Sequence, residues 1–544
     1  MTLLICQKML TRIPKVSLLL ILLLVSTRAQ NLVHRHLPSI AVVEYEQITQ
    51  PSFTTRDAQI KNAEKYIEII DELSRKYHLI LVIFPEATLD YFKSKQDLID
   101  NGAEFKQHIV PCNQTNIPVF LKMLSCAAQK YHVTIVFNLI EKEAQRVFTS
   151  DALLNIDGTL EFSLKRENRI GTGALHNKPV AFAIPVRFIF SIVSGAFLRQ
   201  PNFDFTPTSF VTGFSFSYEK IVNRNSKRNY VVCSNWISQL PFLTSLQVVQ
   251  MWAQEFNITV FMSGANNPAK GQGGTAIYHR EDGPILMEIG AKRGTKAYVY
   301  HFINNTSGAL AESVEEKSVD ELAKEMDNFY LEQDPDLDRY KSLVLRKKES
   351  FVYLCNDNVK DNYFCCSFDI KLSINTSVTN KKRYTYHLVA YKGYKTYHNI
   401  FRPGGIEVCA VIACLNSKLK SCGQRFKNYD EIGWPVTFEK LVIKATFGMP
   451  RKEKIYYSSQ FPNSLLSSIR PIHPDFTSWS SQIIFDAQNK SYLERTFALL
   501  EPQSKILTFG IFGRNFTLHD QRSKGQKLSF HPLGIVLSLI IINY

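Results

Sequence analysis

An uninterrupted apolar run constrains the fold of this chain more than any other feature. Residues 79–84 read Leu-Ile-Leu-Val-Ile-Phe, so a strand here would be apolar on both faces. Strands of that kind occur in parallel sheets whose two faces are both covered. The preceding residues 57–77 carry isoleucine and alanine at helical spacing. A helix that leads into a buried strand is the repeating unit of layered α/β domains.

The same pattern recurs along the first half of the chain. It predicts a strand over residues 40–45 and two further pairs of a helix followed by a strand, at residues 118–131 with 133–140 and 243–256 with 258–262. It also predicts a hairpin of residues 152–156 and 159–164 that turns at Asp157-Gly158. Strands that alternate with helices predict a layered α/β domain over about residues 40–302.

The second half of the chain has a different texture. Helical periodicity fades after Tyr330, and short β-rich runs separated by turns replace it: residues 351–354, 383–391, 436–446 and 506–512. Residues 312–338 are acidic, and we expect them to be a solvated boundary. The expected organisation has five parts: residues 1–29, 30–310, 311–338, 339–522 and 523–544.

Both ends of the chain predict export. Residues 1–29 combine a charged start, an apolar run and the small-residue exit Thr27-Arg28-Ala29, a pattern typical of a secretory signal peptide. The alternative for this segment is a buried N-terminal strand. Residues 533–542 are apolar and follow Ser523-Lys524-Gly525, which predicts a glycolipid (GPI) anchor at Ser523 or Gly525. The alternative for this tail is a last β-strand or a plain apolar terminus.

Sequons for N-glycosylation agree with export. We expect Asn257 to be the least accessible of them, because it precedes a strand-like run. The sequons fall at Asn113, Asn257, Asn304, Asn305, Asn375, Asn489 and Asn515.

Cysteine usage also favours an oxidising compartment. Of ten cysteines, Cys6 lies in the expected signal peptide, which leaves the odd number nine. Six of these are close together in the second half and predict a disulfide framework, although their pairing cannot be deduced: Cys355, Cys365, Cys366, Cys409, Cys414 and Cys422. A zinc site is disfavoured, because the adjacent Cys365-Cys366 lacks the usual ligand spacing and no histidine pair follows.

Composition and motifs exclude several classes of function. Hydrophobic residues make up 45% and charged residues 21%, so the chain is neither disordered nor fibrous. The net charge of +15 comes without a nucleic-acid-binding motif, so no nucleic-acid partner is expected. Gly271-Gln272-Gly273-Gly274 lacks the Lys-Ser/Thr of a phosphate loop, and the histidines suggest no metal cluster. We therefore expect no cofactor.

Glu86 is the first candidate for chemistry. It follows the buried run directly, after Pro85, which cannot extend a strand ladder. The chain should turn there and present Glu86 at the carboxyl end of the sheet, where open α/β folds place their sites. Taken alone, a carboxylate in this place is most often a cap or a loop charge. Burial would raise its pKa and suit it to proton transfer.

An ordered set of motifs extends this interpretation. The set resembles the biotinidase and vanin (pantetheinase) group of the carbon–nitrogen hydrolase, or nitrilase, family, and the C-terminal cysteines with Phe509-Gly510-Ile511-Phe512-Gly513-Arg514 resemble that group's second domain. The motifs are Ala41-Val42-Val43-Glu44-Tyr45-Glu46, Val82-Ile83-Phe84-Pro85-Glu86, Val110-Pro111-Cys112-Asn113, Leu124-Ser125-Cys126, Trp236-Ile237-Ser238-Gln239-Leu240-Pro241 and Ser263-Gly264-Ala265-Asn266-Asn267.

The resemblance implies both a fold and a reaction. The fold is a nitrilase-like α-β-β-α sandwich followed by a β-rich, disulfide-stapled domain. The reaction is hydrolysis of linear amides such as pantetheine or biotin amides, without metal or organic cofactor. A glutamate base takes the proton of a cysteine, the sulfur attacks the carbonyl to form a thioester, and a lysine stabilises the charge on the oxygen.

This chain departs from the family pattern at two of those three positions. Glu86 matches the glutamate, but Arg166 stands at the lysine position, in Arg166-Glu167-Asn168, and Ser217 stands at the cysteine position. A shift of one residue, to Lys165, would point to the other face of a strand. A further glutamate of the family falls near Thr172. Serine holds its proton more tightly than a thiol, and a guanidinium does not reproduce the point charge of a lysine.

Cys233 is the leftover thiol once Cys112–Cys126 and the six-cysteine set are paired. The motif from Trp236 to Pro241 places it one strand too late for the nucleophile, and we interpret it as a buried structural thiol. Two hypotheses remain. In the first, the protein binds an amide ligand or acts as a scaffold with turnover lost, whereas in the second it is an altered amidohydrolase using Glu86, Arg166 and Ser217. The expected partners are a small amide and, through the anchor, the outer face of the plasma membrane, unless the protein is simply secreted.

Overall fold

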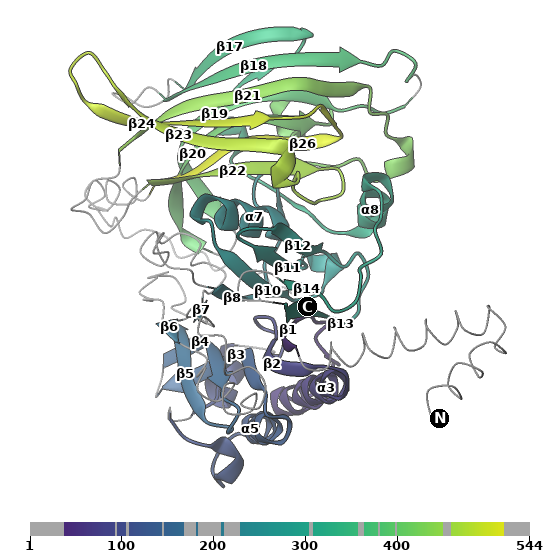
Figure 1. The fold of residues 1–544 in the computed structure, drawn as a ribbon, viewed down its shortest axis with the longest axis vertical. Coiled ribbons are helices and arrows are strands. Elements are labelled where there is room, and N and C mark those ends of the chain that lie inside the picture. The colour runs from purple at the N-terminus through teal and green to yellow at the C-terminus, as the bar shows by residue number, and fades with distance from the viewer. Residues whose placement is uncertain are drawn as a thin grey trace, which may run out of the picture.

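The computed structural model describes residues 37–92, 95–104, 108–143, 146–167, 181–182, 208–210, 229–303, 308–356, 364–378, 381–397, 400–449 and 458–515. Figure 1 shows two stacked parts, with the purple-to-teal first half below the green-to-yellow second half. Among the predicted site residues, Glu86 and Arg166 lie in the described ranges and Ser217 lies outside them.

The first part contains two sheets that pack face to face. The first sheet has the strand order β14-β13-β1-β2-β3-β4-β5, in which β1, β2 and β3 are parallel. Its strands are β1 (Pro38–Glu44), β2 (His78–Ile83), β3 (Thr134–Glu143), β4 (Arg146–Leu154), β5 (Leu160–Glu167), β13 (Lys296–Phe302) and β14 (Gly308–Leu310). Helices α3 (Thr55–Lys76) and α5 (Val119–Tyr131) cover its outer face, where their apolar side chains share a core with those of β1, β2 and β3. The short α4 (Lys95–Asn101) lies beside α3.

The second sheet has the order β12-β11-β10-β8-β7-β6, with β8 and β10 parallel. Its described strands are β6 (Ala181–Phe182), β7 (Thr208–Phe210), β8 (Asn229–Ser234), β10 (Thr259–Gly264), β11 (Thr275–His279) and β12 (Gly283–Glu288). Helix α7 (Ser245–Phe256) covers its outer face. A separate apolar core, which includes Val136, Leu153 and Phe261, fills the space between the two sheets. The predicted α-β-β-α sandwich is therefore confirmed.

Local sequence signals explain where the helices begin. Thr54 caps α3 in a capping box with Asp57, and Thr244 caps α7 in the same way with Gln247. The predicted strand over residues 79–84 is β2, whose last five residues are all buried. None of the helices in the described part of the chain combines the length and the apolar character that crossing a membrane requires.

The second part is β-rich, as predicted, and two sheets build it. Its strands are β16 (Lys341–Val344), β17 (Glu349–Asn356), β18 (Phe364–Ile374), β19 (Thr385–Tyr397), β20 (Ile400–Cys414), β21 (Val436–Gly448), β22 (Ser458–Leu466), β23 (Thr477–Phe485), β24 (Ser491–Leu499), β25 (Gln503–Ser504) and β26 (Ile506–Asn515). Three disulfides join the six-cysteine set as Cys355–Cys365, Cys366–Cys409 and Cys414–Cys422. A fourth, Cys112–Cys126, lies in the first part.

The acidic segment between the two parts is not solvated throughout, which corrects the expectation from its composition. It forms α8 (Val319–Glu325), and its next residues bury Met326 and Phe329. The strand β15 (Glu332–Gln333) pairs in parallel with β9 (Gln239–Leu240), directly after β8. The expectation was wrong because it was based on the charged residues of the segment and did not consider Met326 and Phe329, which pack between the two parts.

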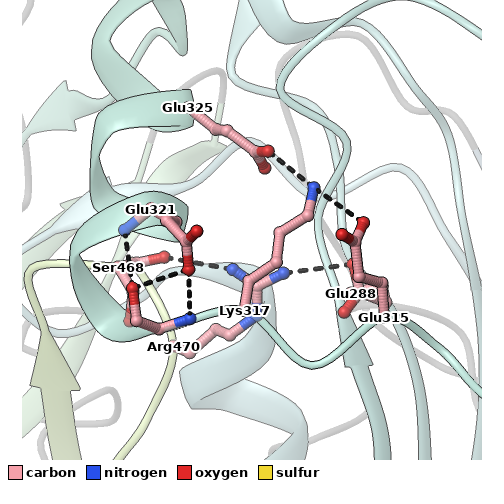
Figure 2. A network of polar contacts seen from close by, with 8 residues as sticks. Glu288, Glu315, Lys317, Glu321, Glu325, Ser468 and Arg470 are labelled. Carbon is pink, nitrogen blue, oxygen red and sulfur yellow. Dashed lines mark hydrogen bonds and ion pairs between the residues drawn. The ribbon is translucent and has the colours of Figure 1, made fainter.

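Polar contacts also connect this segment to its surroundings. Figure 2 shows Lys317 between Glu325 and Glu315, at 2.6 and 3.9 Å. In the same view, Arg470 of the second part donates to Glu288 of β12 at 3.1 Å. The segment itself is connected to the second part by Arg425, which donates to the carbonyls of Ala323 and Met326 at 2.9 Å. It is connected to the first part by the N–H of Tyr330, which donates to the carbonyl of Pro268 at 2.9 Å.

Candidate active site

Glu86 lies in a turn at the carboxyl end of β2. The buried Phe84 continues the pairing of β2, since its N–H donates to the carbonyl of Val136 at 2.9 Å. Pro85 then ends the ladder, and Glu86 is half-buried in the turn that follows. The next residue, Ala87, has a φ of 55°, in the left-handed region that an L-residue rarely adopts. The backbone beside Glu86 is therefore held in a specific and unfavourable conformation.

An asparagine on the neighbouring strand holds this turn. The N–H of Ala87 donates to Oδ1 of Asn138 in β3 at 3.1 Å. The Nδ2 of Asn138 donates in turn to Oδ1 of Asp151 in β4 at 2.7 Å. Asn138 and Asp151 are directly paired across the two strands, and each is 2% exposed. Both face the other sheet, because Val136 and Leu153, two residues away on each strand, belong to the core between the sheets.

The facing sheet contributes the thiol of Cys233. This residue lies on β8, is not in a disulfide, and is 1% exposed in the core between the sheets. Burial raises the pKa of the Cys233 thiol well above its usual value, and the negative charges of Asp151 and Glu86 and a hydrogen bond to Asp151 raise it further. At neutral pH the sulfur is therefore protonated and donates to Asp151. A thiol in that state is not a ready nucleophile.

The loop after Glu86 is fastened by another acid. Asp90 accepts hydrogen bonds from the side chain of Gln59 in α3, at 2.6 Å, and from the N–H of Ile140 in β3, at 2.5 Å. Burial raises the pKa of Asp90 to about 6, although both hydrogen bonds act in the opposite direction. The turn that carries Glu86 is thus held at both of its ends.

Main-chain bonds join the two sheets at this same end of the sandwich. The N–H of Tyr45, after β1, donates to the carbonyl of Gly264 at 3.1 Å, and the N–H of Asn266 donates back to Tyr45 at 2.8 Å. Glu44 is 3% exposed here and accepts from the N–H of Gly290 at 2.8 Å. Burial raises the pKa of Glu44. Several polar groups therefore gather where β1, β2, β8 and β10 end.

The backbone register places the two candidates for the lysine position on opposite faces of β5. Arg166 pairs with Thr149, whereas Lys165 pairs with Ser150. Thr149 is two residues before Asp151 and so shares its face toward the second sheet. The hydroxyl of Ser150 donates to Glu141 at 2.9 Å on the other face. Position 166 therefore lies on the same face as Asp151, and Ser217 and Thr172 lie outside the described residues.

Sequence reasoning missed Asn138, Asp151, Asp90 and Glu44. A single amide in the apolar strand Val136-Phe137-Asn138-Leu139 was the available signal for the first of them. Burial requires such a group to find a partner, but the sequence does not say which one. The proximity of Cys233 to Glu86 was not expected either, although its burial agrees with the structural interpretation.

The structure places several of the remaining predicted sites. The sequon residues Asn113, Asn375 and Asn489 are exposed, and so is Asn257, contrary to our expectation. The glycan predicted at Asn515 is not compatible with this fold, since its Nδ2 is buried and donates to Glu407 at 3.0 Å. The other sequons, at Asn304 and Asn305, and the anchor residues Ser523 and Gly525, lie outside the described residues.

One described group of side chains has the composition of a metal site. The ligand atoms of His387, Cys414 and Cys422 lie within 4.8 Å of one another. Two of the three are joined in a disulfide, however, so their sulfur atoms are not thiolates. The group as it stands therefore does not fit a metal.

Two domain families match this chain. Residues 39–183 match the carbon–nitrogen hydrolase family, and residues 329–519 match the vanin C-terminal domain. The first range contains Glu86, Asn138 and Asp151. The second covers most of the β-rich part.

Curated relatives align with large parts of this chain. Vanin-like protein 1 of Drosophila melanogaster is 27% identical over 500 residues, covering 87% of this chain and 85% of that protein. Vanin-like protein 2 of the same organism is 23% identical, covering 91% and 92%. Human biotinidase is 23% identical over 388 residues, covering 63% of this chain and 68% of that protein.

Among solved structures, Nit3 of Saccharomyces cerevisiae, a member of the nitrilase superfamily, aligns with a TM-score of 0.36 at 11% identity, covering 48% of this chain and 88% of that one. An alignment this weak adds nothing to the assignment. The two domain families and their order along the chain support it instead. This protein, with an α-β-β-α hydrolase sandwich joined to a disulfide-stapled β-domain, belongs to the vanin/biotinidase group of the nitrilase superfamily.

Proposed function

We propose that this protein is an exported member of the vanin/biotinidase group that recognises linear amides of the pantetheine or biotin amide class and hydrolyses them poorly or not at all. The observation that carries the proposal is the state of the Cys233 thiol, whose pKa is raised by burial and by the negative charges of Asp151 and Glu86. Cys233 is buried, and neighbouring negative charges hold it in the protonated form. This sulfur is therefore not prepared to replace the missing cysteine.

The inherited positions support the same conclusion. By resemblance, Ser217 stands where the reaction needs a thiol and Arg166 stands where it needs a lysine. A serine hydroxyl needs a strong base to become a nucleophile, and a carboxylate such as Glu86 is a weak base for it. Losing one group that stabilises the developing oxyanion typically costs about a hundred- to a thousandfold in rate. The loss of the thiol at position 217 and of the lysine at position 166 together favour binding without turnover.

The alternative is an amidohydrolase with an altered mechanism. The fastening of the Glu86 turn supports it, because Asn138 and Asp90 hold the general base in a defined place. The register of β5 supports it as well, since position 166 shares a face with Asp151. In this version, Glu86, Arg166 and Ser217 act together.

The cellular setting belongs to the same proposal. Four disulfides fit an exported protein. The signal peptide over residues 1–29 and the anchor at Ser523 or Gly525 would place the protein on the outer face of the plasma membrane. Its partners there would be a small amide and the membrane that holds the anchor.

The test is to measure binding and turnover separately. The full chain, recovered from a secreting cell, is given pantetheine and biotin amide; we expect calorimetry to detect binding while product formation stays at background. The double variant Ser217→Cys with Arg166→Lys should gain turnover, and Ser217→Cys alone, its matched control, should gain less. Wild-type turnover that disappears in both Glu86→Ala and Ser217→Ala would overturn the proposal in favour of the alternative.

A further inference from the structure

The turn that carries Glu86 needs a restraint. Ala87 has a φ of 55°, a conformation that an alanine leaves unless something holds it. The hydrogen bond from its N–H to Asn138 is that restraint, at 3.1 Å. Because Ala87 is bonded directly to Glu86, the direction of the carboxylate depends on this bond.

Asn138 is itself fixed from the other side. Its Nδ2 donates to Asp151 at 2.7 Å, so the amide cannot rotate without losing one bond or the other. Asp151 accepts a further hydrogen bond from Cys233, on the second sheet. The contacts thus run from Ala87 through Asn138 and Asp151 to Cys233, and they join the Glu86 turn to the facing sheet.

Packing alone does not account for these two side chains. Asn138 and Asp151 are each 2% exposed, on strands whose flanking residues Val136 and Leu153 belong to the apolar core between the sheets. A pair of apolar side chains would fill this space without the desolvation cost of an amide and a carboxylate. What an apolar pair could not supply is the acceptor for the N–H of Ala87.

We propose that Asn138 and Asp151 are positioning residues, which hold the Glu86 turn and tie it to the thiol of Cys233 across the two sheets. The importance of these roles for amide recognition rests on the proposed function, because Glu86 is the residue that they hold in place. Neither residue needs to touch the ligand.

The thiol provides a readout that does not depend on any ligand. Glu86 and Asp151 are the charged groups that act on Cys233. Only a thiolate reacts with iodoacetamide, and because Cys233 is 1% exposed the reagent reaches it only when the two sheets open locally. The alkylation rate of Cys233, followed by mass spectrometry of the native full chain, is therefore divided in every variant by the opening frequency of β8, measured by amide hydrogen exchange. The corrected rate reports how strongly a neighbouring negative charge acts on the thiol. Removing the charge with Glu86→Gln should lower the pKa of the Cys233 thiol and raise the corrected alkylation rate by about threefold or more.

The decisive measurement is whether that acceleration survives the loss of Asn138. Asn138→Leu keeps the volume and removes both hydrogen bonds, so the turn is released and Glu86→Gln should then change the alkylation rate by less than about 1.5-fold. Ser150→Ala is the matched control. It removes one buried hydrogen bond between the same two strands, β3 and β4, but on their opposite face, and should leave the threefold effect intact.

Two further variants keep the proposal open to refutation. Ala87→Gly accepts the left-handed conformation without a restraint, so adding it to Asn138→Leu should restore the sensitivity to Glu86→Gln. If Asn138→Leu does not fold, Asn138→Ser, measured in the same way, takes its place. An unchanged threefold effect in the Asn138 variant, or no rescue by glycine, would overturn the proposal.

Calorimetry with pantetheine separates this proposal from the proposed function. If pantetheine binds, Asn138→Leu should weaken binding, but not further in a protein that already carries Glu86→Gln. If pantetheine does not bind while the alkylation results hold, the proposed function fails and the positioning roles stand. If pantetheine binds and the alkylation results fail, the positioning roles are wrong and the function stands.

Discussion

Two regions of this molecule bury polar groups in very different ways. Where α7 meets the second part, Glu255 accepts from Arg495 at 2.7 Å and from the indole of Trp479 at 2.7 Å, and the guanidinium stacks on that indole. At the end of the sandwich, Asp151 accepts from the amide of Asn138 at 2.7 Å and raises the pKa of the Cys233 thiol on the facing sheet. In the first region a carboxylate is bonded to a guanidinium. In the second region hydrogen bonds run from Asp151 through Asn138 to the exposed Ala87.

The difference distinguishes a structural ion pair, Glu255 with Arg495, from a group of side chains that can affect chemistry, Asn138, Asp151 and Cys233. An acid that is matched by a nearby cation is neutralised and holds two elements together. An acid that raises the pKa of a neighbouring group, as Asp151 does for Cys233, acts on the chemistry of that group. The two regions should therefore respond differently to substitution, in stability for one and in chemistry for the other.

The largest expected effect is the loss of stability when the ion pair between Glu255 and Arg495 is broken. Glu255→Ala leaves the guanidinium of Arg495 buried without its carboxylate, and we expect it to lower the free energy of unfolding by about 3–5 kcal/mol in denaturant titrations. The matched control is Asp369→Ala on the same sheet. It breaks an ion pair of similar length, Lys440–Asp369 at 2.6 Å, that is exposed to solvent, and should cost less than about 1 kcal/mol. Equal costs for the two substitutions would contradict the comparison.

Asp90 should make the stability of the site region depend on pH. Its pKa is raised from 3.8 to about 6, so the folded state binds more protons than the unfolded state between these values. Its contribution to stability is therefore complete below pH 4 and is lost as the pH rises through 6, by up to about 3 kcal/mol. Asp90→Asn should remove this term, so the stability of the variant relative to the wild type should improve from pH 4 to pH 7. A constant difference would show that burial of Asp90 has no such effect.

The smallest expected effect is at the thiol. Cys233→Ala removes a buried sulfur and one hydrogen bond to Asp151, and should lower the free energy of unfolding by about 1–2 kcal/mol. Cys233→Ser keeps a donor for Asp151 and should cost less. Thermal unfolding of both variants measures this. If the wild type has amidase activity and Cys233→Ala loses it, the thiol is a nucleophile and the interpretation of Cys233 as a protonated structural residue is wrong.

The fold was largely predictable because its signals are local. The apolar run of β2 and the helical spacing of apolar residues before it are read from adjacent residues, and they placed β2 and α3 near their observed bounds. The acidic segment was mispredicted because its charges outnumber the few residues, such as Met326 and Phe329, that pack between the two parts. Composition measures an average, whereas packing selects individual side chains.

The site was less predictable because it depends on contacts between distant strands. Glu86 could be found from Pro85 and the strand before it. Asn138 and Asp151 could not, since their roles follow from the antiparallel register of β3 and β4 and from the approach of β8 in the other sheet. For the same reason Asn515 passes as an ordinary sequon in the sequence, although in the fold its amide is engaged by Glu407, far away along the chain.

Helix α7 has a consequence for how this protein can be divided. Ten of its twelve residues are buried, some against the second sheet and others, such as Gln247 and Gln250, bonded to residues of the β-rich part. A fragment that ended after the first part would carry this helix with an apolar flank open to water. The hydrolase half is thus not a portable module, and we expect such a truncated product to aggregate.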